Sequence, residues 1–141
     1  MIVLDVNVVV IAYRADHPRH ADVRWWFDEL LAGDDRFTVT DGVWASFIRL
    51  VTNRRVFPVP TPMDEAFEFL RTVRRQPHHQ ALVPGEEHLT IFERLCLDSG
   101  ATGDLVPDAY LAALALEHGC AVVSLDGDFS RFEGLDWRRP G

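Results

Sequence analysis

The first ten residues, Met1-Ile-Val-Leu-Asp-Val-Asn-Val-Val-Val10, indicate the fold class of this chain. Ile2 to Leu4 is a short apolar run, typical of a buried strand, and the carboxylate of Asp5 follows it directly. Asn7 comes two residues later, before more apolar residues that can form a helix. In an open parallel sheet, ligands bind in the crevice outside the carboxyl ends of the strands. Because burying a bare charge is costly, a carboxylate at that place indicates a cation or another partner.

The other end of the chain repeats this arrangement. Residues 121–125, Ala-Val-Val-Ser-Leu, form a second apolar run, and Asp126-Gly127-Asp128 comes at its end. Taken alone, such an acidic stretch is also ordinary turn chemistry. Two strand ends that both carry acids nevertheless predict one acidic pocket with a divalent cation.

Apolar spacing and chain-breaking residues predict that strands and helices alternate between these two ends. We expect strands at residues 2–4, 37–40, 81–83, 121–125 and 135–137. We expect helices at residues 8–13, 19–31, 43–51, 63–75, 86–97 and 106–118. Asp41 is expected to cap the third of these helices. This alternation favours an α/β fold with a parallel sheet.

Length and composition are those of an ordinary globular protein. The 141 residues suit a single domain over 1–141, and 48% of them are hydrophobic and 26% charged. An apolar stretch of about eighteen residues, long enough to cross a membrane, is absent. The N-terminus lacks a basic leader, so we expect a cytoplasmic protein without a signal peptide. Cys96 and Cys120 are then expected as reduced thiols, with a disulfide as the alternative.

The charge balance bears on nucleic-acid binding. The net charge of -8 argues against a generic nucleic-acid binder, which is usually basic. Cations bound at an acidic site would cancel part of that charge and face the phosphates. All 14 basic side chains are arginine, which suits bidentate contact with phosphate.

Asp108 is a further candidate for the acidic pocket. Leu111, Ala112 and Ala115 follow it with helical spacing, so it shares their apolar face. Alanine permits close packing of this helix on the sheet, which would bring Asp108 to the strand ends. Oxygen ligands of this kind suit Mg²⁺ or Mn²⁺ rather than zinc. The alternative is that Asp108 is only a first-turn acid favoured by the helix dipole.

Four segments carry a resemblance to a known family. They are Val3-Leu-Asp-Val-Asn7, Phe47-Ile-Arg-Leu-Val-Thr-Asn53, Val106-Pro-Asp-Ala-Tyr-Leu-Ala-Ala-Leu-Ala115 and Val123-Ser-Leu-Asp-Gly-Asp-Phe129. In this order the chain resembles the PIN-domain ribonucleases, and more closely the VapC toxins of type II toxin–antitoxin systems, of the mycobacterial type. The resemblance implies a PIN-like α/β domain with a central parallel β-sheet flanked by α-helices.

The resemblance also implies roles for individual residues. Asp5, Asp108 and Asp126 would bind Mg²⁺ or Mn²⁺ and act in catalysis, and Asp128 would assist them. Asn7 would order the site. Asn7, Ser46 and Arg49 are the residues that we expect at the substrate. Relatives usually carry a glutamate where this chain has Ser46, so the number of metal ions, one or two, stays open.

The leading hypothesis is a metal-dependent endoribonuclease that acts as the toxin of a VapBC-type pair. The expected partners are a VapB-like antitoxin, an RNA substrate and a second copy of the chain in a homodimer, with no membrane. The alternative, motivated by Ser46, is a catalytically weak RNA- or antitoxin-binding module. A phosphatase of the haloacid-dehalogenase type is disfavoured, because Asn7 stands where that family needs an acid and the chain has no lysine.

Overall fold

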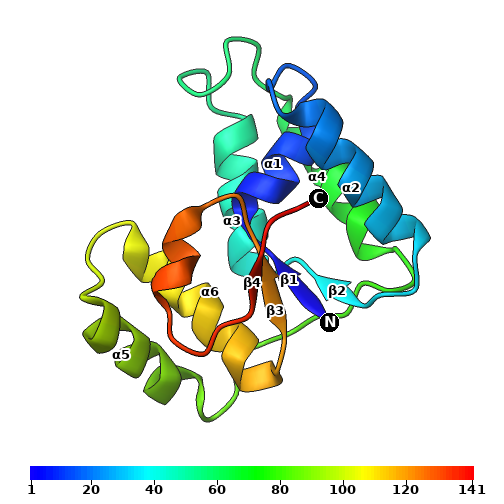
Figure 1. Ribbon diagram of the computed structural model, residues 1–141. Coiled ribbons are helices and arrows are strands. Elements are labelled where there is room, and N and C mark those ends of the chain that lie inside the picture. Colours follow the sequence, from blue (N-terminus) through cyan, green and yellow to red (C-terminus); the bar gives the residue numbers. More distant parts are fainter.

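A parallel sheet of four strands forms the centre of the structure, a computed structural model that describes residues 1–141 (Figure 1). The strand order is β2-β1-β3-β4. The strands are β1 (Ile2–Leu4), β2 (Phe37–Thr38), β3 (Ala121–Val123) and β4 (Trp137–Arg138). The helices are α1 (Val6–Tyr13), α2 (His20–Ala32), α3 (Asp41–Val51), α4 (Met63–Arg74), α5 (His88–Ser99), α6 (Leu105–His118) and the 3-10 helix η1 (Gly127–Arg131). The α/β fold with a parallel sheet is therefore confirmed.

The register of the sheet brings both ends of the chain to one edge. Leu4 of β1 pairs with Val123 of β3, so the residues that follow them, Asp5 and Ser124, lie at the same carboxyl edge. The backbone N–H of Asp5 continues the pairing and donates to Val123 O at 3.0 Å. Since β4 is also parallel to β3, the residue after it reaches this edge too. The topology therefore gathers residues that are more than a hundred positions apart.

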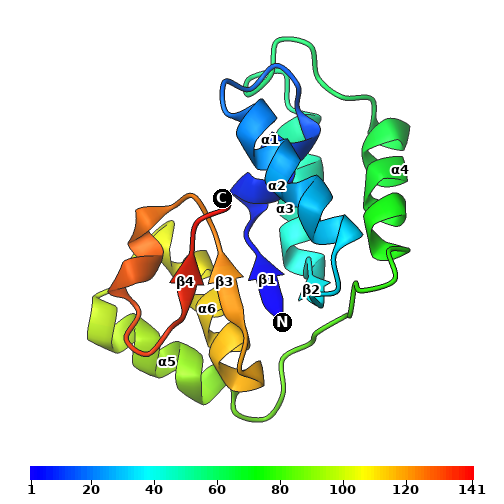
Figure 2. The same ribbon diagram turned by 45° about the vertical axis from the view of Figure 1, so that its right-hand side comes forward.

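The helices form two groups around the sheet (Figures 1 and 2). Helices α1 to α4 pack on one another beside β1 and β2, whereas α5 and α6 pack together beside β3. The first group encloses aromatic side chains that are almost fully buried, including Phe27 and Phe47. In α6, Ala109, Ala112 and Ala115 are fully buried, which allows the close helix-to-sheet approach expected from the sequence.

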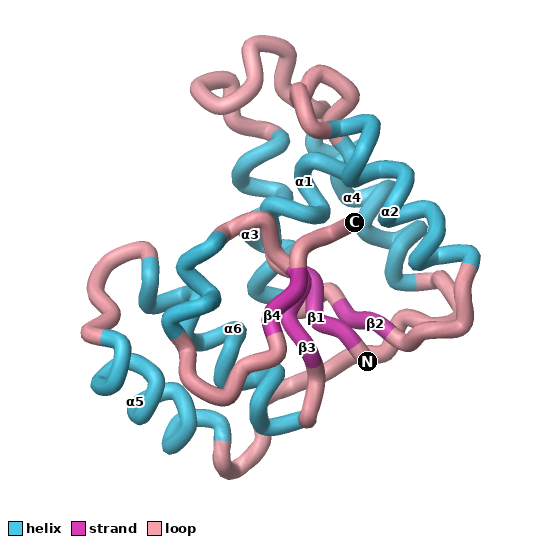
Figure 3. The backbone as a smooth tube through the Cα atoms, viewed as in Figure 1, coloured by secondary structure: helices cyan, strands magenta, loops and turns pink.

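The strand expected at residues 81–83 is wrong. This stretch is an extended connection between α4 and α5, drawn as a loop in Figure 3. The chain touches the sheet earlier, where Phe37 pairs with His79 in a single bridge. Ala81 and Val83 are exposed, so little apolar burial would stabilise a strand there.

Several boundaries also differ from those expected. Helix α1 begins at Val6 rather than residue 8, because Asp5 caps it by accepting from Val6 N at 2.8 Å. Thr40, not Asp41, caps α3, and its Oγ1 accepts from Val43 N at 3.3 Å. The strands at 37–40 and 121–125 are shorter than expected, and the last strand lies at 137–138. Beyond the ends of β2 and β3, side chains replace strand partners as hydrogen-bond acceptors: Val39 N donates to His79 Nε2 and Leu125 N donates to Asn7 Oδ1.

Two further sequence-based expectations concern the cysteines and membrane segments. Cys96 and Cys120 are both free thiols, as expected. Among the helices, none combines the length and the apolar character that crossing a membrane requires.

Candidate active site

Asp5 is held rigidly at the end of β1. It is 7% exposed, and its carboxylate accepts three hydrogen bonds from the chain. The donors are Val6 N at 2.8 Å, Ser124 Oγ at 2.7 Å and Asn7 Nδ2 at 3.3 Å. Burial raises the pKa of Asp5 above its usual value; the bonds from Ser124 and Val6 lower it in part, and the charge of Asp126 raises it further. Asp5 is therefore a fixed carboxylate whose negative charge is not fully compensated.

Ser124 connects the two acidic strand ends. Its side chain is fully buried, and its Oγ donates to Asp5 Oδ2 while accepting from Asn7 Nδ2 and Asp126 N, both at 3.0 Å. The sequence analysis gave this residue no role. The sequence feature that could have identified it is a small polar residue between a buried strand and an acid. Its partner Asp5, however, lies 119 residues away in the sequence, so the contact is not visible locally.

Asn7 completes the connection from the first turn of α1. Its Oδ1 accepts from Leu125 N at 3.1 Å, and its Nδ2 donates to both Asp5 and Ser124. The side chain thus uses both ends of its amide to hold the β1 and β3 ends together. That Asn7 orders an active site and contacts the substrate stays a prediction.

Asp126 and Asp128 form the turn that follows β3. Asp126 caps η1, and its Oδ1 accepts from Asp128 N at 2.9 Å. Asp128 is exposed, and Asp126 is half-buried. Asp126 therefore has the ordinary role of an aspartate in a turn, in which its side chain accepts a backbone hydrogen bond. The turn also places both carboxylates near enough to Asp108 for their charges to raise its pKa, and Asp126 near enough to Asp5 to raise the pKa of that group too.

Asp108 lies in the first turn of α6 and faces the same region. Its pKa is raised to about 7, first by burial and then by the negative charges of Asp5, Asp126 and Asp128 and of a fifth acid, Asp104. No hydrogen bond from the chain contributes to this pKa. Sequence reasoning missed Asp104, whose signal is an acid four residues before Asp108 at the start of the same helix.

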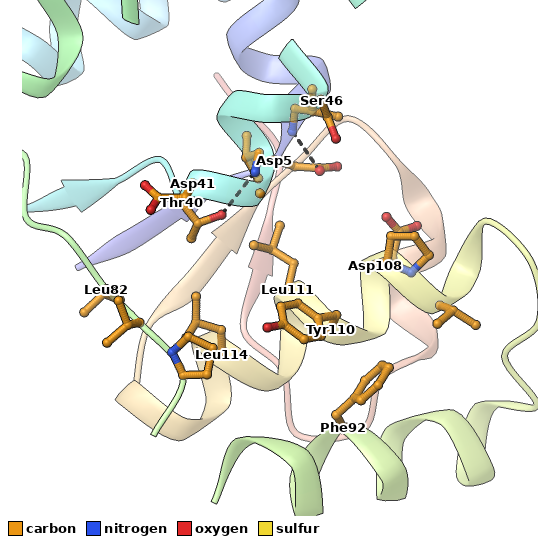
Figure 4. A pocket seen from close by; sticks show the side chains of 17 residues that line it. Asp5, Thr40, Asp41, Ser46, Leu82, Phe92, Asp108, Tyr110, Leu111 and Leu114 are labelled. Atoms are coloured by element: carbon orange, nitrogen blue, oxygen red, sulfur yellow. Dashed lines mark hydrogen bonds between the residues drawn. The ribbon is translucent and has the colours of Figure 1, made fainter. Parts of the chain in front are cut away.

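A cavity of about 500 Å³ opens between two of these acids, Asp5 and Asp108, and an apolar wall (Figure 4). Asp104, Asp126 and Asp128 are not among its lining residues. Asp5, Asp108 and Ser46 line one part of it, and Figure 4 shows that they come from three separate elements. The apolar wall comprises Leu82, Phe92, Leu111 and Leu114, among others. Glu117 of α6 holds the connection that forms part of this wall, since its carboxylate accepts from Gly85 N at 2.8 Å and Glu87 N at 3.1 Å.

The acids fit a hard cation by their chemistry. They supply only oxygen donors, the type that Mg²⁺ and Mn²⁺ prefer. Burial, together with repulsion from the other acids, raises the pKa of Asp108. As they stand, however, no three His, Cys, Asp or Glu side chains are close enough together to form a preformed metal cluster. Like charges without a counter-ion repel one another, so a bound cation would have to draw these carboxylates together.

Other candidate residues lie outside this cavity. Arg49 is exposed on α3 and is not among the lining residues, so its contact with substrate stays a prediction. His79 packs edge-on against Phe37, and its Nε2 accepts from Val39 N at 3.4 Å. His79 is therefore engaged within the fold. His20 contacts Ile11 O at 2.8 Å and is likewise engaged within the fold.

Comparison with known proteins identifies the class of this fold and site. Residues 2–135 match the PIN domain family. Ribonuclease VapC25 of Mycobacterium tuberculosis is 55% identical over 140 residues, which cover 99% of each chain. The chain therefore belongs to the PIN-domain family, and within it to the VapC ribonucleases. The resemblance found in the sequence is confirmed.

Solved structures agree on the fold. VapBC2 from Rickettsia felis, bound to a DNA fragment from its promoter, matches with a TM-score of 0.72 and 17% identity over 99% of this chain and 98% of that one. Mycobacterium tuberculosis VapC20, a Sarcin-Ricin loop cleaving toxin, matches with a TM-score of 0.66 and 17% identity over 92% of this chain and 93% of that one. At these identities the structures support the PIN-like fold alone.

Proposed function

We propose that this chain is a divalent-metal-dependent endoribonuclease and the toxin of a VapBC-type toxin–antitoxin pair. Family membership supports cleavage of RNA, since the relative with 55% identity is named a ribonuclease. The observation that carries the metal-dependent part is the raised pKa of Asp108, caused by burial and by the surrounding carboxylates. A bound cation would offset both the burial and the repulsion, and would let these acids be charged together at neutral pH.

In this proposal Asp5, Asp108 and Asp126 hold Mg²⁺ or Mn²⁺, and Asp128 assists. When bound, such an ion supplies an activated water and stabilises charge on a phosphoryl oxygen. Ser124 and Asn7 keep the Asp5 carboxylate in one orientation through their hydrogen bonds to Oδ2. Asp108, with a pKa of about 7, releases its proton when the ion binds.

The proposal also accounts for how an acidic chain can bind RNA. The net charge of -8 repels a phosphate backbone, but cations at the site reverse the local sign where the phosphate must approach. Ser46 shares the cavity with Asp5 and Asp108, and we propose that it, Asn7 and Arg49 contact the RNA.

A partner for the chain is also proposed. The similar fold from Rickettsia felis was solved as VapBC2, which supports a VapB-like antitoxin as the partner of this chain. A homodimer of the chain is proposed on the family resemblance. Expression of the chain alone should slow bacterial growth, and co-expression of the cognate antitoxin should relieve the effect.

A second candidate function is a catalytically weak binding module. Ser46 favours it, because a neutral hydroxyl lines the cavity where relatives usually have a carboxylate. Without the charge of that carboxylate, the site would bind a cation with lower affinity. RNA or antitoxin binding would then be the main activity.

Cleavage of RNA by the purified chain separates the two candidates. We expect cleavage with Mg²⁺ or Mn²⁺ and none in EDTA. Asp5→Asn should reduce the rate by about a hundredfold or more, because it removes a ligand charge with little change of shape. Asp22→Asn is the matched control, since its side chain is 82% exposed on α2 and it should cleave normally.

Circular dichroism should show that both variants are folded. Cleavage that persists in EDTA, or full activity in folded Asp5→Asn, would contradict metal dependence. RNA binding without cleavage under any metal would favour the binding module instead.

A further inference from the structure

Arg139 differs from the other arginines of the chain in how its guanidinium is held. Side chains of Arg14, Arg19, Arg24 and Arg138 have a carboxylate partner. Of the arginines without one, Arg139 alone donates a side-chain hydrogen bond, from Nη1 to Leu125 O at 2.8 Å. Its charge is therefore fixed in position but not neutralised by an acid.

The position of Arg139 follows from the sheet. Val123 pairs with Arg138, so the next residue of each strand, Ser124 and Arg139, lies at the carboxyl edge. The two strands parallel to each other thus bring Arg139 beside the turn that carries Asp126. A Cβ added at Gly127, inside that turn, would lie 3.6 Å from Arg139 Nη2. Figure 2 shows the C-terminus at this edge, beside the start of α1.

The guanidinium of Arg139 packs over the ring of Trp137. The Arg139 Cζ lies 5.1 Å from the centre of the Trp137 ring, a distance at which a cation is attracted to the ring face. Trp137 is itself anchored, because its Nε1 donates to Ser124 O at 3.1 Å. The tail of the chain and the second acidic turn therefore form one hydrogen-bonded unit.

We propose that Arg139 binds a backbone phosphate of the RNA, adjacent to the phosphate that is cleaved. One N–H of the guanidinium is used by Leu125 O, and the exposed side chain keeps the others for a ligand. An anchored guanidinium loses little freedom on binding and can contact two phosphate oxygens at once. Its place beside Asp126 sets it at the rim of the proposed metal site. This inference rests on the proposed function and deepens it.

The neighbouring Arg138 provides a matched control. Arg138 is paired with Asp136, with bonds of 2.7 Å and 3.2 Å. Both arginines are exposed and adjacent in the sequence. They differ in whether a carboxylate already compensates the charge.

The test is binding of a short single-stranded RNA in EDTA, measured by fluorescence anisotropy over a range of salt concentrations. Arg139→Gln should weaken binding by about three- to tenfold, and the slope of log affinity against log salt should fall by about 0.7, the value for one lost phosphate contact on a single strand. Arg138→Gln should stay within about twofold of wild type with an unchanged slope. Arg139→Lys should keep the slope, because it keeps the charge.

Cleavage with metal separates failure of this inference from failure of the proposed function. If wild type cleaves RNA, Arg139→Gln should raise KM more than it lowers kcat. If Arg139→Gln bound RNA with the affinity and salt dependence of wild type, the role of Arg139 would be overturned. The same holds if Arg139→Gln and Arg138→Gln lost equal affinity. Neither result would bear on the proposed function. Loss of the slope in Arg139→Lys would also overturn the role of Arg139 and indicate a structural one. A wild type that does not cleave RNA would overturn the proposed function first.

Discussion

Asp5 and Asp108 line the same cavity but are held in opposite ways. The Asp5 carboxylate accepts bonds from Val6, Ser124 and Asn7, so its position is determined by the fold. The pKa of Asp108 is set by burial and by repulsion from its neighbours, without a hydrogen bond. Asp5 is thus held in one orientation by the fold, whereas Asp108 has a pKa near neutrality and is only partly charged at pH 7. The difference indicates that the fold fixes Asp5 and leaves Asp108 unsupported. In the proposed function, a bound cation would stabilise the charge of Asp108.

Ser124→Ala should have the largest effect on this comparison, because it would remove the shortest of the three hydrogen bonds that hold Asp5 and leave only those from Val6 and Asn7. Removing the hydroxyl takes away the 2.7 Å bond to Asp5 and the acceptor for Asp126 N. Leaving buried polar groups unpaired should lower the free energy of unfolding by about 1–3 kcal/mol. Cleavage should also slow, because the Asp5 carboxylate gains freedom.

Urea unfolding and a cleavage assay on the same preparation would measure both effects. Ser130→Ala is the control, since Ser130 is exposed and its Oγ donates to Gly127 O. Its stability should change by no more than about 0.5 kcal/mol. A Ser124→Ala protein as stable and active as wild type would mean that Asp5 does not depend on this network.

Ser46→Glu should test the part of the comparison that concerns Asp108, the acid without hydrogen bonds from the chain. Ser46 lines the cavity with both acids, so a carboxylate there adds a ligand charge. We expect Mn²⁺ to bind about tenfold more tightly, because hard cations favour added oxyanion ligands. Ala45→Glu is the control, since Ala45 is exposed on the same helix and lies outside this cavity. Equal Mn²⁺ affinities for the two variants, measured by competition with a fluorescent chelator, would show that Ser46 does not face a metal.

The pH dependence of stability should show a smaller effect. The pKa of Asp108 is about 7 in the folded chain and 3.8 for a free side chain, and that of Asp5 is also raised. Between these values the folded chain binds more protons than the unfolded chain. The free energy of unfolding without metal should therefore fall as pH rises from about 4 to about 7.

Asp108→Asn removes the group with the largest shift, so its stability should fall less over this window. Urea midpoints at pH 5 and pH 7.5 in EDTA would measure the difference between wild type and variant. Adding Mn²⁺ at pH 7.5 should raise the wild-type midpoint more than that of the variant. An identical pH dependence in both proteins would show that Asp108 does not carry the repulsion.

The features that could be predicted from the sequence are those encoded within a few residues. A run of apolar residues ending in an acid identified Asp5 and Asp126, because strand ends and turns are local patterns. Helical spacing to buried alanines likewise placed Asp108 on the face toward the sheet.

The features that were missed depend on distant partners. Ser124 contacts Asp5 across 119 positions, and the bond from Arg139 to Leu125 forms only once β4 has paired with β3. The strand expected at residues 81–83 failed because the chain pairs with β2 only at His79, and Ala81 and Val83 beyond it are exposed. Thr40 rather than Asp41 caps α3 because the chain turns one residue earlier, a choice that composition does not reveal.

The most direct test of the proposed metal site is calorimetric titration of Mn²⁺ into wild type and Asp108→Asn at pH 7, in two buffers of different ionisation enthalpy. Because the pKa of Asp108 is about 7, wild type should bind Mn²⁺ and release a fraction of a proton, so the measured heat should differ between the buffers. Asp108→Asn should bind about tenfold or more weakly and release fewer protons. Equal affinity and equal proton release in the two proteins would contradict a metal site that Asp108 completes.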